Sequence, residues 1–440
     1  MAAEPEDLSP DPTIAELIAA RPHLRHHAMD GLVMEDVSLN RIAGTTGTPT
    51  WVYSAGALRA RYRALTQALK SAGLDAHPHY AVKANDHLAI LSLLNKEGAG
   101  ADVVSEGELL RARAAGIPSA KIVFSGVGKS ERELRLALDH DIGQINVESI
   151  EELRMLSAIA ASMGRIARIA PRVNPDVDAA THDKISTGRA RDKFGIPYKN
   201  TATFFEEAAR LPGIEITGIA THIGSQIMNL APYREAFARM ADLVITLRQH
   251  GHTVKTVDCG GGLGIPYRNQ PGPGPDALAG VMKAAFHNLD VRLALEPGRW
   301  LVGPAGVLLS TVILEKQAEG ARFLVLDAAM NDLIRPAMYD AWHGIVPLAA
   351  ADAVAPVSPA DIVGPVCESG DTFARERLMP RLSPGSRVAI LDAGAYGAVM
   401  SSPYNARPRA AEVLVDGAVF TVIRPRQTHA SLWEQEVMPG

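Results

Sequence analysis

Between about Leu58 and Leu295 the chain alternates short apolar runs with amphipathic stretches, and most runs end in polar or glycine-rich residues. This alternation is typical of βα units built around a parallel sheet. Eight runs fit the pattern, at residues 79–82, 101–104, 122–124, 144–147, 166–173, 216–221, 256–258 and 292–295. Eight βα units in a segment of this length predict a TIM barrel, in which the carboxyl ends of the strands share one rim.

Two of the intervening segments carry apolar residues at helical spacing, and we expect both helices to pack on the sheet. The predicted apolar faces are Leu109, Leu110 and Ala114 in the helix that starts near Glu106, and Ile150, Leu153, Leu156 and Ile159 in the segment from Glu148.

After Arg299 the helical alternation stops. β-branched runs separated by Gly, Pro and Asp predict a mostly antiparallel sheet. These runs are residues 307–314, 321–326, 387–391, 412–415 and 419–423. Short runs at 31–34 and 50–53 predict N-terminal strands that join the same β domain, preceded by a short helix at 13–20. The predicted organisation is a loose leader (1–25), N-terminal strands (26–56), the barrel (57–298) and a C-terminal β domain (299–440).

Length and composition narrow the classes of protein. A chain of 440 residues exceeds the usual size of a single core, which favours two domains. The net charge of -5 and the scattered basic residues give no footprint for nucleic acid, and no apolar run has the length of a membrane span. Only two cysteines are present, which fits a reducing compartment, by default the cytoplasm. We therefore expect a small-molecule partner.

Lys83 is the first candidate for chemistry, because it directly follows a strand-like run that carries its amine to the strand end. A lysine is ordinarily a solvated surface residue, so its position alone is a weak signal. The same rim, however, would gather other polar strand ends. These are residues 83–85, 102–106, Glu148, 172–174, 222–225, 260–262 and 296–299.

A set of motifs running in order from about Gly47 to the end resembles the diaminopimelate decarboxylases. They are pyridoxal-phosphate enzymes that pair a TIM barrel with a β domain, as alanine racemases and ornithine decarboxylases also do. The motifs include Tyr80-Ala-Val-Lys-Ala-Asn85, Gly100-Ala-Asp-Val-Val-Ser-Glu-Gly-Glu108, Lys184-Ile-Ser-Thr-Gly188, Thr221-His-Ile-Gly-Ser-Gln226, Gly260-Gly-Gly-Leu-Gly264, Glu296-Pro-Gly-Arg299, Cys367-Glu-Ser-Gly-Asp371 and Asp392-Ala-Gly-Ala-Tyr-Gly397. The resemblance implies decarboxylation of meso-diaminopimelate to L-lysine and CO2, the last step of lysine biosynthesis.

The resemblance also implies roles around pyridoxal 5'-phosphate. Lys83 would form the covalent link, Glu296 would keep the pyridine ring protonated, and His222 would stack on the ring. The remaining implied cofactor contacts are Ser225, Gly261, Gly262, Gly298, Arg299 and Tyr396. Taken alone, the glycines at 260–262 are a weak signal, because glycine clusters are common in turns. No metal is implied.

Substrate recognition would require groups for a distal amino-acid centre. Arg299 and Arg335 offer guanidiniums that suit a carboxylate, Tyr339 adds a phenol, and Glu368 suits a distal ammonium. Tyr396 resembles a tyrosine that contacts both phosphate and substrate. A domain-interface salt bridge or hydrogen bond is the alternative for Arg335 and Tyr339.

Cys367 lies in a polar, loop-like setting, and the resemblance makes it the proton donor, delivered with Glu368 into the pocket of a partner subunit in a homodimer. Cys259 follows an apolar run and is predicted to be a small core residue.

Two other functions stay open. One is a decarboxylase for another diacidic or carboxylated polyamine substrate, against which Arg335 and Glu368 together argue. The other is a non-catalytic cofactor-binding or regulatory homologue, which the presence of Lys83 and Cys367 disfavours.

Overall fold

The computed structural model describes residues 11–179, 187–188 and 193–439. The start of the predicted leader and most of the motif at 184–188 lie outside the described residues. The chain forms two compact units. The first contains Arg59–Ile265 and Gly272–Trp300, and the second contains residues 11–58, Pro266–Pro271 and residues 301–439.

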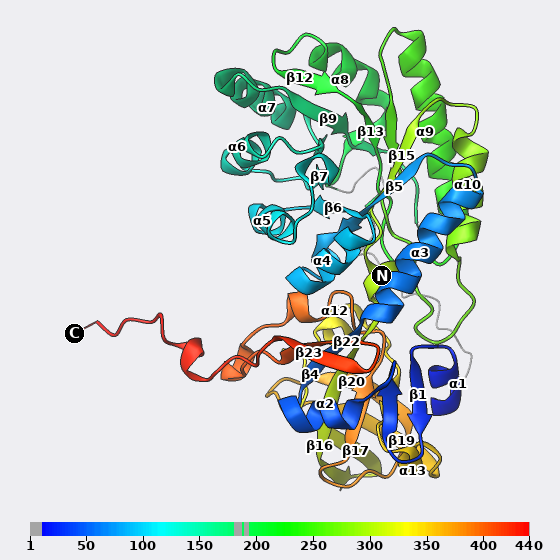
Figure 1. Cartoon of the computed structure of the whole chain (residues 1–440), viewed down its shortest axis with the longest axis vertical. Coiled ribbons are helices and arrows are strands. Elements are labelled where there is room, and N and C mark those ends of the chain that lie inside the picture. Colours follow the sequence, from blue (N-terminus) through cyan, green and yellow to red (C-terminus); the bar gives the residue numbers. More distant parts are fainter. Residues whose placement is uncertain (1–10, 180–186, 189–192, 440) are drawn as a thin grey trace. The chain divides into compact units, whose positions relative to one another are not determined.

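The first unit is a parallel β barrel surrounded by helices (Figure 1). Its strands are β5 (Ala76–Ala81), β6 (Gly100–Val103), β7 (Ile122–Phe124), β8 (Gln144–Val147), β9 (Ala167–Pro171), β12 (Ile214–Ile216), β13 (Gly218–Ala220), β14 (Thr256–Asp258) and β15 (Arg292–Leu295). The order in the sheet is β12-β9-β8-β7-β6-β5-β15-β14-β13, and every neighbouring pair is parallel. The TIM barrel expected from the alternating runs is confirmed.

The sixth predicted strand is divided at Thr217, which closes the barrel. The backbone N–H of Thr217 donates to Ile169 on one side (2.8 Å), and its carbonyl accepts from Thr256 on the other (3.2 Å). β12 therefore pairs with β9 and β13 with β14, and a parallel bridge between Arg172 and Ala220 joins the two edges. The fifth predicted strand is also interrupted, since Val173–Asn174 forms a separate strand, β10, paired with β11 (Ile196–Pro197).

Helices follow the strands in the alternation that the sequence predicts. They are α3 (Ala55–Ser71), α4 (Leu88–Lys96), α5 (Glu106–Ala114), α6 (Glu131–Asp139), α7 (Ile150–Met163), α8 (Thr201–Ala208), α9 (Ala231–Gln249), α10 (Pro275–Phe286) and α11 (Arg299–Val302). Serines cap three of them: Ser105, Ser130 and Ser149 accept from backbone N–H groups in the first turns of α5, α6 and α7. Each cap ends the loop after a strand and fixes where the helix begins.

The apolar face predicted for α5 is wrong in part. Leu109 is buried as expected, but Leu110 is 43% exposed and Ala114 is exposed, whereas Ala112 is buried. Leu109 and Ala112 are three residues apart and therefore share the face that packs on the sheet. The prediction for α7 holds better, since Leu153, Leu156 and Ile159 are all buried.

The second unit is built on a mixed β sheet. Its strands are β4 (Thr50–Ser54), β16 (Gly306–Ala318), β17 (Ala321–Leu326), β18 (Ile345–Pro347), β19 (Val357–Val363), β20 (Thr372–Pro380), β21 (Arg387–Ile390), β22 (Ala411–Asp416) and β23 (Val419–Arg424). A smaller sheet contains β1 (Leu24–His27), β2 (Gly31–Met34) and β3 (Val37–Ser38), and the helices are α1 (Ile14–Ala19), α2 (Leu39–Thr46), α12 (Arg335–Tyr339) and α13 (Ala350–Ala353).

Most pairs in the large sheet are antiparallel, as predicted, but β17–β19 and β22–β4 are parallel. The N-terminal strand β4 lies between β16 and β22, inside the sheet rather than at its edge. Strands β19 and β20 were not expected from the sequence, because Pro359 interrupts one run and Arg375, Glu376 and Arg377 interrupt the other.

Within the described part of the chain, no helix has both the length and the apolar character needed to cross a membrane.

Gly218 allows the close contact between β13 and β14, because a Cβ there would overlap the carbonyl oxygen of Thr256. We expect Gly218→Ala to lower the free energy of unfolding by about 1–3 kcal/mol. Gly280→Ala is the matched control: Gly280 is exposed in α10 with open space around it, so the added methyl should stabilise by about 0.5–1 kcal/mol. Thermal melting measures both, and an unchanged midpoint for Gly218→Ala would contradict the close packing.

Candidate active site

Lys83 lies in a single 3-10 turn, η1 (Val82–Ala84), at the carboxyl end of β5. Its Nζ donates to Oδ2 of Asp102, at 2.9 Å, and the lysine side chain is 34% exposed whereas the aspartate is fully buried. The other carboxylate oxygen, Oδ1 of Asp102, has no hydrogen-bond partner among the described residues. Two adjacent strands, β5 and β6, therefore bring an amine and a buried carboxylate together on the rim.

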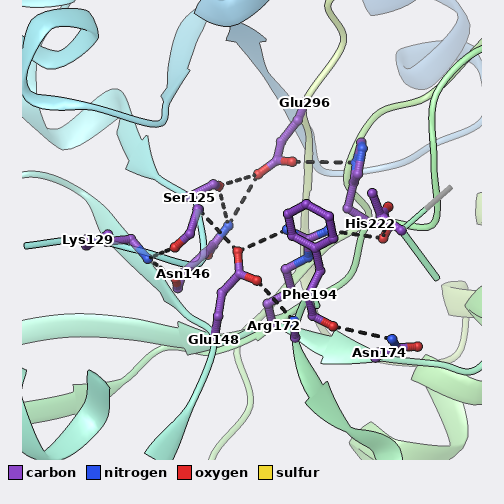
Figure 2. Close-up of polar contacts among 12 residues, drawn as sticks. Ser125, Lys129, Asn146, Glu148, Arg172, Asn174, Phe194, His222 and Glu296 are labelled. Carbon is purple, nitrogen blue, oxygen red and sulfur yellow. Dashed lines mark hydrogen bonds and ion pairs between the residues drawn. The ribbon is translucent and has the colours of Figure 1, made fainter. Parts of the chain in front are cut away.

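Glu296 follows β15 and is only 6% exposed. Its Oε1 accepts two hydrogen bonds, from Oγ of Ser125 (3.1 Å) and from Nδ2 of Asn146 (3.2 Å), as Figure 2 shows. Burial raises the pKa of Glu296 well above its ordinary value, and the negative charges of Asp102 and Asp258 add to the effect. The carboxyl group is thus held in a fixed orientation and retains a proton more readily than a solvated glutamate.

His222 follows β13, and its surroundings favour the neutral ring. Burial lowers its pKa well below 6.5, with further lowering from the positive charges of Arg172 and Lys83. Its Nδ1 accepts the backbone N–H of Gly261 at 3.0 Å, so the ring proton is on Nε2. Nδ1 also lies 3.9 Å from Oε2 of Glu296, but a neutral ring makes this contact an approach rather than an ion pair.

The glycine loop after β14 brings the backbone close to neighbouring strands. A Cβ at Gly261 would overlap the carbonyl oxygen of Glu296, and Gly262 has φ of 100°, a conformation that favours glycine. At Gly298 a Cβ would meet the Cβ atoms of Ala81 and Ala84 at 3.1 Å, next to Lys83. Nearby, Nη2 of Arg299 donates to Oγ of Ser225 at 3.0 Å.

A buried ion pair connects the strand ends on the opposite side of the rim. Nη1 of Arg172 donates to Oε1 of Glu148 at 3.0 Å, and its guanidinium lies 4.8 Å from the centre of the Phe194 ring. Nη2 of Arg172 donates to the carbonyl of His222 at 3.4 Å. Figure 2 shows the chain of contacts that links Glu148 through Arg172 to His222.

In the second unit, Arg335 is buried, with 5% exposure. Its Nη1 donates to Nε2 of His343 at 2.7 Å, while Nδ1 of His343 donates to the carbonyl of Leu391. The guanidinium also lies 4.8 Å from the centre of the Tyr267 ring. Tyr339 is half-buried in the same short helix, α12.

Cys367 and Glu368 are exposed in the loop between β19 and β20. The backbone N–H of Cys367 donates to Asn405 (3.4 Å), and Glu368 accepts from the hydroxyl of Tyr404 (2.6 Å). Tyr396 is half-buried, with φ of 54°. Cys259 is buried, as expected for a core residue, and burial raises the pKa of its thiol well above the ordinary value.

The barrel thus gathers the predicted residues Lys83, His222, Ser225, Gly261, Gly262, Glu296, Gly298 and Arg299 at the ends of its strands. Arg335, Tyr339, Cys367, Glu368 and Tyr396 belong to the second unit. Ser125 and Asn146, which contact Glu296, were not among the predicted site residues. Asn146 had one signal, because it is a polar residue inside the run Gln144–Val147.

The barrel residues fit pyridoxal phosphate. Lys83 supplies an amine at a strand end, beside a buried aspartate oxygen that has no other described partner. The loop at Gly261 and Gly262 has no room for Cβ atoms, which lets its backbone approach a phosphate closely. Glu296 offers a buried carboxyl that can pair with a ring nitrogen.

Comparison with known proteins agrees with this chemistry. Residues 55–303 match the pyridoxal binding domain of pyridoxal-dependent decarboxylases, which places the barrel in that class. The chain is 48% identical to diaminopimelate decarboxylase of Zymomonas mobilis, over 92% of this chain and 96% of that protein. It is 46% identical to diaminopimelate decarboxylase of Aquifex aeolicus, over 93% and 96%. The chain belongs to the diaminopimelate decarboxylase family.

Solved structures share the fold. Diaminopimelate decarboxylase from Helicobacter pylori, complexed with L-lysine, has a TM-score of 0.87 at 40% identity, over 90% of this chain and 98% of that chain. The enzyme from M. jannaschii, also with L-lysine, has a TM-score of 0.89 at 35% identity, over 95% and 98%. A lysine/ornithine decarboxylase from Vibrio vulnificus, at 23% identity, shares the fold with a TM-score of 0.76, over 86% and 97%.

The lowered pKa of His222 predicts a neutral ring with its proton on Nε2 between pH 6.5 and 8. A lowered pKa means that the proton is already lost below pH 6.5, so no titration should occur in this range. Nitrogen-15 NMR of histidine-labelled protein reports the tautomer, with His222→Gln to assign the signal. A resonance of His222 that titrates near pH 6.5 would contradict the geometry.

Proposed function

We propose that this chain is a pyridoxal-phosphate-dependent decarboxylase that converts meso-2,6-diaminopimelate to L-lysine and CO2, as the last step of lysine biosynthesis. The main structural support for this activity is the rim of the barrel. There the Lys83 amine, the neutral His222 ring and the buried Glu296 carboxyl come together. High identity to diaminopimelate decarboxylases along nearly the whole chain supports the substrate.

Bound pyridoxal phosphate supplies a carbonyl that amines attack and a ring that accepts the electron pair left when CO2 departs. Lys83 would form the covalent link to the cofactor. The Asp102 carboxylate orients its amine, at 2.9 Å. The backbone of Gly261, Gly262 and Gly298, with Ser225 and Arg299, would hold the phosphate. Tyr396 would contact both the phosphate and the substrate.

Glu296 would keep the ring nitrogen of a bound cofactor protonated, because a buried carboxyl paired with a protonated nitrogen is more favourable than either group alone in a desolvated site. His222 would pack on the cofactor ring as a neutral group. Its hydrogen bond from Gly261 fixes the plane of the imidazole, so the ring contributes stacking without adding a positive charge that would compete with the protonated nitrogen.

Substrate recognition falls to Arg299, Arg335, Tyr339, Glu368 and Tyr396. Arg335 is rigid, since it is buried against His343 and Tyr267, and a fixed guanidinium is suited to a carboxylate. Glu368, exposed and in contact with Tyr404, suits an ammonium. Together the two charges select a distal amino-acid centre over a simple diamine end.

Cys367 donates a proton to the substrate carbon after CO2 leaves. Its exposure on a loop of the second unit is compatible with delivery to another subunit, so we propose a homodimer with two shared active sites. Both cysteines are free thiols, which is compatible with a cytoplasmic location.

The direct test measures CO2 release from meso-diaminopimelate, ornithine, arginine and lysine by the purified protein with cofactor. We expect turnover of meso-diaminopimelate alone. Lys83→Ala should abolish CO2 release, and borohydride reduction should no longer attach the cofactor covalently to the protein. Lys96→Ala, on the exposed last turn of α4, should change neither result. Preference for ornithine or lysine would exclude the proposed substrate, and fixable cofactor in Lys83→Ala would exclude the role of Lys83.

Subunit mixing tests the shared site. Lys83→Ala and Cys367→Ala chains should each be inactive, but a mixed dimer has both lesions in one pocket and an intact second pocket. After re-equilibration about half of the dimers are mixed, so activity should approach about a quarter of wild type by symmetry. Native mass spectrometry of differently labelled chains confirms exchange. An inactive mixture after proven exchange would rule out the shared site.

A further inference from the structure

A buried ammonium lies behind the two side chains that contact Glu296. Lys129 precedes α6, and its side chain is 1% exposed. Its Nζ donates to the carbonyls of Gly126 (2.7 Å) and Asn146 (2.6 Å) and to Oε1 of Glu152 (2.8 Å). An ammonium has three protons, so these contacts use its full donor capacity. Figure 2 shows Lys129 beside Ser125 and Asn146.

The two carbonyls belong to the strand ends that carry the contacts to Glu296. Gly126 directly follows Ser125 after β7, and Asn146 lies within β8. One amine therefore fixes the backbone on both sides of the Ser125–Asn146 pair. Glu152 fixes a third backbone position, because its Oε2 accepts the backbone N–H of Glu148 at 3.0 Å.

The side chains held in this way make the two oxygens of Glu296 unequal. Nδ2 of Asn146 donates to Oγ of Ser125 (3.1 Å), which leaves the hydroxyl proton of Ser125 for Oε1 of Glu296. Oε1 therefore receives two donors, whereas Oε2 receives no hydrogen bond from the described residues. A proton on Glu296 must reside on Oε2, because both donors already point at Oε1.

Stability alone is a weak explanation for the Lys129–Glu152 pair. A buried ion pair costs desolvation, and its replacement by neutral groups of similar shape is often neutral or stabilising. The pair does, however, set the position of two strand ends at a site where orientation matters.

We propose that Lys129 and Glu152 are positioning residues for catalysis. They act through Ser125 and Asn146, which saturate Oε1 of Glu296 and reserve Oε2 for the cofactor. The inference rests on the proposed role of Glu296, and it assigns functional roles to four residues outside the contacts with Lys83, the phosphate and the substrate.

The test variant is Lys129→Met/Glu152→Gln, which removes both charges at nearly constant shape. The side-chain amide introduced at position 152 can still accept from the backbone of Glu148, so the main loss is the ammonium that holds the two carbonyls. Lys129→Arg, which keeps the charge, should restore part of the function. The matched control is Arg154→Ala, also on α7, which breaks an exposed ion pair with Glu207.

We expect the double variant to bind pyridoxal phosphate about tenfold more weakly, measured by titrating cofactor-free protein. It should also lower kcat about tenfold with little change in KM, because the substrate groups are untouched. The near-visible band of the bound cofactor should titrate at a shifted pH, since it reports the charge at the ring nitrogen. Arg154→Ala should match wild type in all three measurements.

A double-mutant cycle with Asn146→Ala identifies the route. If Lys129 acts through Asn146, the Lys129→Met/Glu152→Gln change should have little further effect on cofactor affinity in the Asn146→Ala background. Full additivity, or a variant that only melts at lower temperature with affinity, kcat and pH midpoint unchanged, would overturn the proposal. If the double variant fails to fold, Ser125→Ala, which leaves the ion pair intact, must show the same weaker affinity and shifted midpoint, and wild-type values would overturn the proposal. Cofactor affinity and the pH midpoint of the absorption band are measured without substrate. Both therefore test this proposal even if the proposed substrate is wrong.

Discussion

Three carboxyl groups are buried inside one barrel, and the surrounding residues of the first unit must supply the donors or protons that stabilise them. Asp102, Asp258 and Glu296 are each less than a tenth exposed, and a desolvated carboxylate is unfavourable unless donors or protons offset it. Asp102 receives the Lys83 ammonium and Asp258 the backbone N–H of Gly260. Glu296 receives Ser125 and Asn146 and has a raised pKa.

Asn146 connects two of these carboxyls. Its Nδ2 lies 3.2 Å from Glu296 and 3.4 Å from Asp258, and Gln144 donates to its Oδ1 at 2.8 Å. The amide has two protons for three acceptors, Ser125, Glu296 and Asp258, so the contact with Asp258, the longest of the three, is the weakest. Strand β8 therefore connects Glu296 with Asp258, and the charge of Asp258 raises the pKa of Glu296.

The sequence predicted strand positions well where the residue types and the spacing of apolar residues both favour a strand. β7, β8, β14 and β15 have the predicted bounds, and Lys83 and Glu296 lie at strand ends as expected. The break at Thr217 could not be predicted, because it depends on pairing with β9 and β14, strands distant in sequence. The partners of Glu296 could not be predicted either, since contact across a barrel depends on strand stagger and side-chain direction.

The central place of β4 in the large sheet has a consequence for how the chain is made. Its sheet neighbours, β16 and β22, follow the whole barrel in sequence. A ribosome therefore releases the barrel before β4 can be covered on either edge, and the nascent second unit carries an unpaired, apolar strand during that interval. Such long-range pairing is slow to form, which leaves the N-terminal strand open to aggregation and to chaperone binding during synthesis.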